Sequence, residues 1–195
     1  MTTGIALAML GAALAILLSG VGSTMGVVKI SNAANALLSK EPKHFSKLLI
    51  LMLLPTSQSI YGLTVAFMTF VQVGLLGDGI IPLSTGTGLA ILFLCLPVGI
   101  VGMISANLQG SAGVTAVNLY AKQNKMFGNC ILIISASEVF ALFGFLISIL
   151  GVMFIIPYPY VPFAGGGDGY ASTEAASYAF SCVCRCAQNL FIKAV

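Results

Sequence analysis

Four long apolar stretches, separated by short polar segments, dominate the pattern of this chain. No Asp, Glu, Lys or Arg occurs in residues 1–28, 48–77 or 79–121, and residues 126–167 contain only Glu138. A helix needs about 20 apolar residues to cross roughly 30 Å of hydrocarbon. We therefore predict four membrane-spanning helices, at Gly4–Val28, Leu48–Gly74, Gly88–Asn118 and Gly128–Ile156.

Composition supports a protein that lies mostly within the membrane. Of 195 residues, 58% are hydrophobic and 7% are charged, whereas soluble domains have about 25% charged residues. So few charges cannot cover a water-facing surface, which excludes a secreted or cytosolic enzyme. The net charge of +3 comes from lysines close to the membrane and forms no long basic patch, so we expect no nucleic-acid binding.

The lysines predict the orientation of the helices. They flank the first and third connections, whereas the second connection carries only Asp78. Because Lys-rich loops stay in the cytoplasm, we expect both termini to be external. No basic segment precedes the first apolar run, so we expect no cleaved signal peptide. The loop lysines are Lys29, Lys40, Lys43, Lys47, Lys122 and Lys125.

An internal repeat appears when the chain is shifted along itself by 82 residues. The shift pairs Gly20 with Gly102, Ser23 with Ser105, Lys40 with Lys122, Lys43 with Lys125, Phe45 with Phe127, and Gly62 with Gly144. We infer a duplicated helical hairpin whose copies have the same orientation. The predicted organisation is a first hairpin in 1–75, an external loop in 76–87, a second hairpin in 88–156 and a C-terminal extension in 157–195.

Small residues form a stripe along the first and third spans, at spacings of three and four. Such stripes let membrane helices approach closely, and bulky side chains fill the second and fourth spans instead. We expect an oligomeric ring with the odd helices in an inner layer; packing within a single four-helix bundle is the alternative. The stripes are Gly4, Ala8, Gly11, Ala15, Ser19, Gly22 and Gly26, and Gly99, Gly102, Ala106, Gly110 and Gly113.

Glu138 lies about ten residues into the fourth span, near the bilayer centre. A charge there costs about 2.5–3.5 kcal/mol on insertion scales and usually marks an ion or proton path. The repeat places Thr56 at the equivalent position of the first hairpin, so there is one carboxylate for every four helices.

Polar groups of the second span lie at a matching depth, with Leu54, Ser57, Gln58 and Tyr61 on one helix face. Pro55 interrupts this turn and can expose backbone oxygens, and Gln109 adds an amide from the third span. Hydrogen bonding between helices, worth about 0.6 kcal/mol on average, is the simpler interpretation of the two glutamines. The number of oxygens favours a site for a hard cation, Na⁺ rather than H⁺.

The sequence resembles the rotor-ring proteolipid of V-type ATPases, the K or c subunit, most closely the bacterial Na⁺-transporting form. The resemblance rests on the duplicated hairpin and on Leu-Leu-Pro-Thr-Ser-Gln-Ser-Ile-Tyr-Gly at 53–62, Gln109-Gly110, Ser137-Glu138 and Gly144-Phe145. It implies that Na⁺ binds the Leu54 carbonyl, Ser57, Gln58, Gln109 and Glu138, and that Tyr61 hydrogen-bonds the carboxylate. This chain has Ser57 where relatives have Thr, and Thr56 beside the site where they have Gly.

The resemblance also implies a rotary mechanism in the plasma membrane of a bacterium. A homo-oligomeric ring, surrounded by lipid, would carry Na⁺ (or H⁺) past a stator subunit whose membrane Arg pairs with Glu138. The loops around Lys40 and Lys122 would dock central-stalk subunits, and ATP would be hydrolysed or made elsewhere, since this chain has no P-loop. We expect no organic cofactor. The alternatives are a small secondary transporter or antiporter using one membrane Glu, and a structural pore-forming proteolipid.

Three further features are less informative. Pro157, Pro159 and Pro162 exclude a continuous helix at the start of 157–195, for which we favour an external extension. Cys95 and Cys130 are interpreted as buried packing residues and His44 as a solvated loop residue. The one-residue spacing of the tail cysteines is unlike a structural zinc site; they are Cys182, Cys184 and Cys186.

Overall fold

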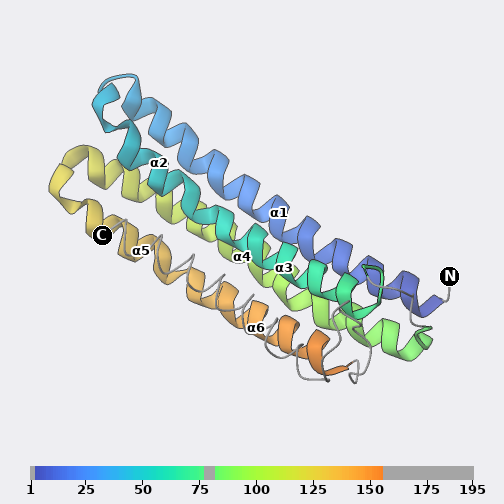
Figure 1. Cartoon of the computed structure of the whole chain (residues 1–195). Coiled ribbons are helices and arrows are strands. Elements are labelled where there is room, and N and C mark those ends of the chain that lie inside the picture. The colour runs from blue at the N-terminus through green and yellow to red at the C-terminus, as the bar shows by residue number, and fades with distance from the viewer. Residues whose placement is uncertain (1–2, 77–81, 156–195) are drawn as a thin grey trace, which may run out of the picture.

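The computed structural model describes residues 3–76 and 82–155, and all regular structure within these ranges is helical (Figure 1). The C-terminal extension and its cysteines lie outside the described residues. The α-helices are α1 (Thr3–Leu38), α2 (Phe45–Leu53), α3 (Ser57–Gln72), α4 (Thr85–Lys122), α5 (Phe127–Ala136) and α6 (Glu138–Ile155). Short 3-10 turns occur at Pro42–His44, Leu54–Thr56 and Asn124–Met126.

The four predicted membrane spans are confirmed in the described part of the chain. Four helical segments are long and apolar enough to cross a bilayer: Thr3–Leu38, Pro42–Gln72, Thr85–Lys122 and Asn124–Ile155. All are longer than predicted, because a helix does not stop where its apolar stretch stops. The 36 residues of α1 extend about 54 Å, well beyond the roughly 30 Å of hydrocarbon.

The duplication is also visible in the boundaries of the elements. The pairs α1 and α4, α2 and α5, and the turns Pro42–His44 and Asn124–Met126 all begin 82 positions apart. Packing follows the same repeat. Gly62 of α3 lies against Ser19 and Ala15 of α1, and Gly144 of α6 lies against Val101 and Pro97 of α4. Each half is therefore a helical hairpin of the same design.

The stripes of small residues bring α1 and α4 together, and the two helices run side by side in the same direction (Figure 1). A Cβ added at Gly22 would overlap the backbone of Met103, and one at Gly110 would overlap the backbone of Gly26. Such close approach is possible only without side chains. The stripes therefore serve helix packing within one chain, between α1 and α4.

The second and fourth spans are each interrupted at an equivalent point. Leu54–Thr56 forms a 3-10 turn around Pro55, and Ser137 separates α5 from α6. Serines of α1 and α4 bond to the backbone at or just after these breaks: Ser23 Oγ accepts from Ser59 N at 3.1 Å, and Ser105 Oγ donates to Ser137 O at 2.8 Å. These backbone polar groups therefore have hydrogen-bond partners within an apolar environment.

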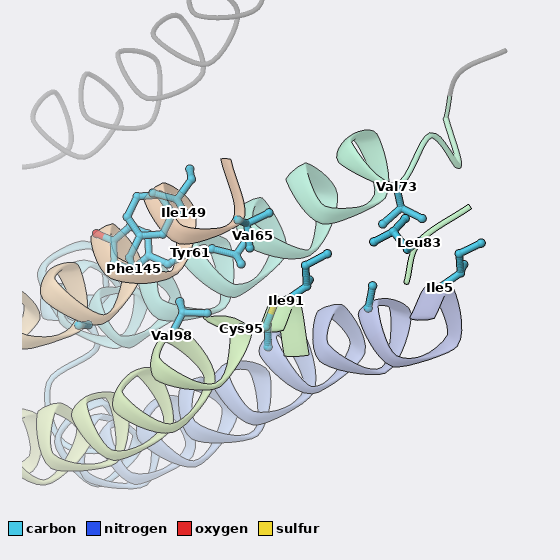
Figure 2. Close-up of a cluster of buried hydrophobic side chains, with 14 residues drawn as sticks. Ile5, Tyr61, Val65, Val73, Leu83, Ile91, Cys95, Val98, Phe145 and Ile149 are labelled. Atoms are coloured by element: carbon cyan, nitrogen blue, oxygen red, sulfur yellow. The ribbon is translucent and has the colours of Figure 1, made fainter. Parts of the chain in front are cut away.

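Buried apolar side chains form two clusters. The Tyr61 cluster, shown in Figure 2, extends from Tyr61 and Phe145 to Ile5 near the start of α1. The Tyr120 cluster lies toward the turns after α1 and α4, and contains Ile30, Ala34, Leu48, Leu51, Ala116, Val117, Tyr120, Cys130, Ile131 and Ile134. Cys95 and Cys130 are buried and free, which confirms their interpretation as packing residues.

The two Lys-containing turns lie at the same end of the molecule (Figure 1) and contact each other through His44. Its Nδ1 lies 2.7 Å from the Tyr120 hydroxyl and its Nε2 lies 2.8 Å from the Glu41 carboxylate. The hydrogen bond from His44, together with the nearby Lys43, lowers the pKa of Glu41. The prediction of a solvated His44 was wrong, since its side chain is only 13% exposed.

Candidate ion-binding site

The polar residues of interest lie between the two apolar clusters. Along α4, the Tyr61 cluster ends at Val98 and the Tyr120 cluster begins at Ala116. Gln109 lies between the two clusters and is fully buried. Gln58 is equally buried on α3. Burying amides in an apolar environment is costly unless they are hydrogen-bonded, so their partners define the site.

The break at Pro55 supplies the first part of the site. The Ser57 hydroxyl donates to the Leu54 carbonyl at 3.1 Å and lies 3.3 Å from Gln58 Oε1. Pro55 has no N–H to donate to the Leu51 carbonyl, and in the 3-10 turn that follows, the Leu54 carbonyl also accepts from the Ser57 N–H. Leu54, Ser57 and Gln58 thus present a carbonyl, a hydroxyl and an amide oxygen within one turn.

The two glutamines bridge the hairpins. Gln58 Nε2 donates to Gln109 Oε1 at 2.7 Å, and Gln109 Nε2 donates to the Ile134 carbonyl at 3.4 Å. The last contact ties the Gln109 amide to α5 and directs its oxygen toward Gln58. This geometry is what the simpler interpretation of the two glutamines, a hydrogen bond between helices, requires.

Glu138 is the first residue of α6 and is half-buried. Its Oε1 accepts a hydrogen bond from the Tyr61 hydroxyl at 2.8 Å. The Tyr61 ring packs against Phe145, with ring centroids 5.2 Å apart (Figure 2). Hydrogen bonds to an ionised carboxylate are among the stronger ones, so Tyr61 both supports and orients the Glu138 side chain.

The contacts join the residues selected from the sequence into two groups. Leu54, Ser57, Gln58 and Gln109 are connected by hydrogen bonds, and Tyr61 connects α3 to Glu138. Thr56 takes no part in either group. Its hydroxyl donates to the Leu53 carbonyl at 2.6 Å, on the exposed side of the turn.

Sequence reasoning missed the residues that support the site. Ser105 fixes the break before Glu138, and the Ile134 carbonyl holds the amide of Gln109. The match of Ser23 with Ser105 in the repeat was the available signal for the first. No sequence signal marked the carbonyl of Ile134, because a backbone acceptor is identified only by the register between helices.

The two groups contain oxygens of several chemical kinds. Carboxylate, hydroxyl, amide and backbone oxygens are ligands that suit small hard cations. One carboxylate and one monovalent cation give a neutral pair, which crosses an apolar region at lower cost than either charge separately. Glu138 is followed along α6 by Val139 and Phe140, which are exposed in the single chain.

Known proteins are similar to most of this chain. The family model for the C subunit of ATP synthase matches twice, at residues 10–69 and 92–151, and these segments are again 82 positions apart. The chain is 35% identical to V-type sodium ATPase subunit K of Enterococcus hirae over 150 residues, covering 77% of this chain and 92% of that protein.

Two relatives from other lineages are more distant. The chain is 27% identical to A-type ATP synthase subunit K of Methanocaldococcus jannaschii, covering 72% of this chain and 59% of that protein. It is 29% identical to the 16 kDa proteolipid of the V-type proton ATPase of Ovis aries, covering 73% of this chain and 88% of that protein. Together with the duplicated membrane hairpin, these matches establish that the chain belongs to the family of ATP synthase C subunits.

Proposed function

We propose that this chain is a rotor-ring subunit of a V-type ATPase or ATP synthase and carries Na⁺ across the membrane on Glu138. The observation that carries the proposal is the position of Glu138, the one carboxylate within the four apolar stretches, which Tyr61 joins to the helix that carries Ser57 and Gln58. Its similarity to a subunit named for sodium transport supports Na⁺ as the ion.

In the proposed site, Glu138 supplies the charge and four other residues supply neutral oxygens. These oxygens are the Leu54 carbonyl, the Ser57 hydroxyl, and the amide oxygens of Gln58 and Gln109. Tyr61 donates to the carboxylate and prevents it from rotating freely. A proton needs only one carboxylate oxygen, whereas Na⁺ needs several ligands, and the four neutral oxygens favour Na⁺ for this reason.

The proposed cycle depends on exchanging the partner of Glu138. A stator Arg attracts the carboxylate and displaces the ion, and a new ion binds once the rotor has moved on. The loops around Lys40 and Lys122 face the cytoplasm and dock the central stalk, with both termini external in a bacterial plasma membrane. ATP hydrolysis or synthesis takes place in other subunits, so this chain is not catalytic.

The test is carbodiimide labelling of the membrane-embedded protein with and without Na⁺. The reagent modifies protonated carboxylates, so bound Na⁺ should protect Glu138 and slow labelling at least several-fold. Glu138→Gln should remove the labelling, and Gln109→Ala should leave labelling but weaken protection. Equal labelling rates with and without Na⁺ in the unmodified protein would contradict Na⁺ binding and assign the site to H⁺.

A further inference from the structure

The apolar surface of α1 and α4 stops well before these helices end. Large hydrophobic side chains are exposed along α1 as far as Val28 and along α4 as far as Leu108, and none is exposed beyond these positions in the described residues of either helix. Lys29 and Ser111 follow at the same height, since Lys29 Nζ lies 3.1 Å from Ser111 Oγ. Lys29 therefore lies within α1, at the boundary of its apolar surface, and not in the connection after the helix.

Beyond this boundary, the exposed side chains of α1 and α4 are small or polar. The stretch from Lys29 to the end of α1 is about 14 Å long, so the boundary is far from the turns. Polar side chains are costly to place in hydrocarbon, and this part of the surface suits water. Its exposed residues are Asn32, Asn35 and Ala36 on α1, and Thr115, Asn118, Ala121 and Lys122 on α4.

The surface of α2 and α5 is different at the same end of the molecule. Phe45, the first residue of α2, is 56% exposed. Because hydrocarbon covers apolar surface and water covers polar surface, the polar boundary lies deeper in the bundle on α1 and α4 than on α2 and α5. The further exposed hydrophobic residues on this side are Leu49 and Leu53 on α2, and Leu132 and Ile133 on α5.

Lys29 retains hydrogen-bond donors for an anion at this boundary. Its ammonium group donates to Asn107 Oδ1 at 2.5 Å and to Ser111 Oγ at 3.1 Å, and both acceptors are neutral. Within residues 3–76 and 82–155, no carboxylate pairs with Lys29. Lysine has three N–H donors, so one remains, and the amide nitrogen of Asn107 is a further donor beside it. An ammonium group at this depth is costly without an opposite charge.

We propose that Lys29 and Asn107 bind the phosphate of an anionic phospholipid, from the leaflet on the side of the Lys-containing turns. Hydrogen bonds from an ammonium group to a phosphate are among the stronger ones, and anionic lipids attract lysines near the membrane surface. The acyl chains cover exposed apolar side chains next to the boundary, such as Met25 on α1 and Leu108 on α4. A free phosphate ion would balance the charge of Lys29 but leave this apolar surface uncovered.

The first test measures the lipids that the full chain retains. The protein is reconstituted with equal amounts of phosphatidylglycerol and phosphatidylcholine, purified in mild detergent, and its bound lipids are quantified by mass spectrometry. Phosphatidylglycerol should be enriched several-fold over phosphatidylcholine. Lys29→Gln should abolish this enrichment and Asn107→Leu should weaken it, whereas Lys29→Arg should retain it, because the arginine keeps the charge.

The matched control is Lys122→Gln, which removes the same charge from the same surface beyond the boundary and should leave most of the enrichment. Inorganic phosphate in the wash should not displace the lipid. Three results would overturn the proposal: equal retention of the two lipids by the unmodified protein, equal loss of enrichment in Lys29→Gln and Lys122→Gln, or displacement of the lipid by phosphate.

The second test locates the boundary itself. In a background with the five native cysteines replaced by alanine, a membrane-impermeant maleimide added to both sides of proteoliposomes should label Asn32→Cys but not Leu49→Cys. Leu49 lies about one turn into α2, whereas Asn32 lies nearly two turns before the end of α1. The position farther from the turns should therefore be the accessible one. Protection of Asn32→Cys, or equally fast labelling of Leu49→Cys, would place the boundary elsewhere and contradict the lipid site at Lys29.

Discussion

At the scale of single residues, the hydroxyl of Tyr61 is the clearest test of how the Glu138 side chain is supported. Tyr61→Phe keeps the ring packed on Phe145 but removes the 2.8 Å hydrogen bond to the carboxylate. Hydrogen bonds to charged groups contribute about 1.5–3 kcal/mol. The Na⁺ concentration needed for half-protection from carbodiimide should therefore rise by roughly tenfold or more.

Tyr120→Phe is the control for this prediction. It removes a tyrosine hydroxyl at the far end of the bundle, where the partner is His44. Protection of Glu138 should then be unchanged. If Tyr61→Phe also left the half-protecting Na⁺ concentration unchanged, Tyr61 would have no role in ion binding.

The sequence could nominate the residues of the site, but not all of their contacts. Leu54, Ser57 and Gln58 share one helix turn, so spacing places them together. The bond from Gln109 to the Ile134 carbonyl depends on how α4 and α5 are aligned, and residue type carries no information about a backbone acceptor. The bond from the Thr56 hydroxyl to the Leu53 carbonyl is different, because it is a local contact three residues back of the kind that Thr commonly makes in helices.

At the scale of helices, the close contact of α1 with α4 gives a sharp prediction about two neighbouring glycines. A Cβ at Gly22 would overlap the Met103 backbone, whereas a Cβ at Gly20 has open space. Gly22→Ala should destabilise the chain by about 1–3 kcal/mol, the usual cost of overpacking. Gly20→Ala should be neutral or slightly stabilising.

Unfolding of the two variants by increasing SDS in mixed micelles would measure this difference. The two substitutions add the same methyl group to the same helix, so helix propensity cancels in the comparison. Equal stabilities for Gly22→Ala and Gly20→Ala would mean that α1 and α4 are not in the contact described.

The helices also mark where sequence reasoning succeeded and failed. The four spans and their duplication follow from hydrophobic patterning, and Pro55 predicted the break in the second span. The break at Ser137 has no proline to signal it. It could still have been anticipated, because Ser137 is the counterpart of Pro55 one repeat later. The end of the first span was placed too early, at Val28, because α1 continues past Lys29 to Leu38.

At the scale of the whole molecule, the contact between the two Lys-containing turns joins the hairpins at one end. Glu41, which His44 also contacts, has a lowered pKa, caused first by the His44 hydrogen bond and then by Lys43. A carboxyl group whose pKa is lowered by folding stabilises the fold above its ordinary pKa of 4.5, and this contribution is lost as the pH falls through the lower folded value.

Glu41→Gln should therefore lower the melting temperature slightly at pH 7, and the difference from the unmodified protein should shrink below pH 4.5 and vanish as the pH falls through the lowered pKa of the folded state. Tyr120→Phe, which breaks the same contact without removing a carboxylate, should lower the melting temperature at both pH values. Thermal unfolding of the detergent-solubilised protein from about pH 7 to about pH 3 would measure both. If Glu41→Gln still lowered the melting temperature at about pH 3, its effect at pH 7 would not come from the charge of the Glu41 carboxylate.

Both hairpins are broken at the same point, yet only the second has an acid beside the break, since Thr56 occupies the equivalent place in the first. If Glu138 carries the ion as proposed, a ring of such chains presents one ion carrier for every two hairpins around its circumference. One full turn would then move half as many ions as a ring of equal size with an acid in every hairpin. Because the same free energy from ATP would be divided among fewer ions, each could be driven against about twice the electrochemical potential difference. In the proposed rotor, a single carboxylate per chain is therefore suited to maintaining a steep ion gradient.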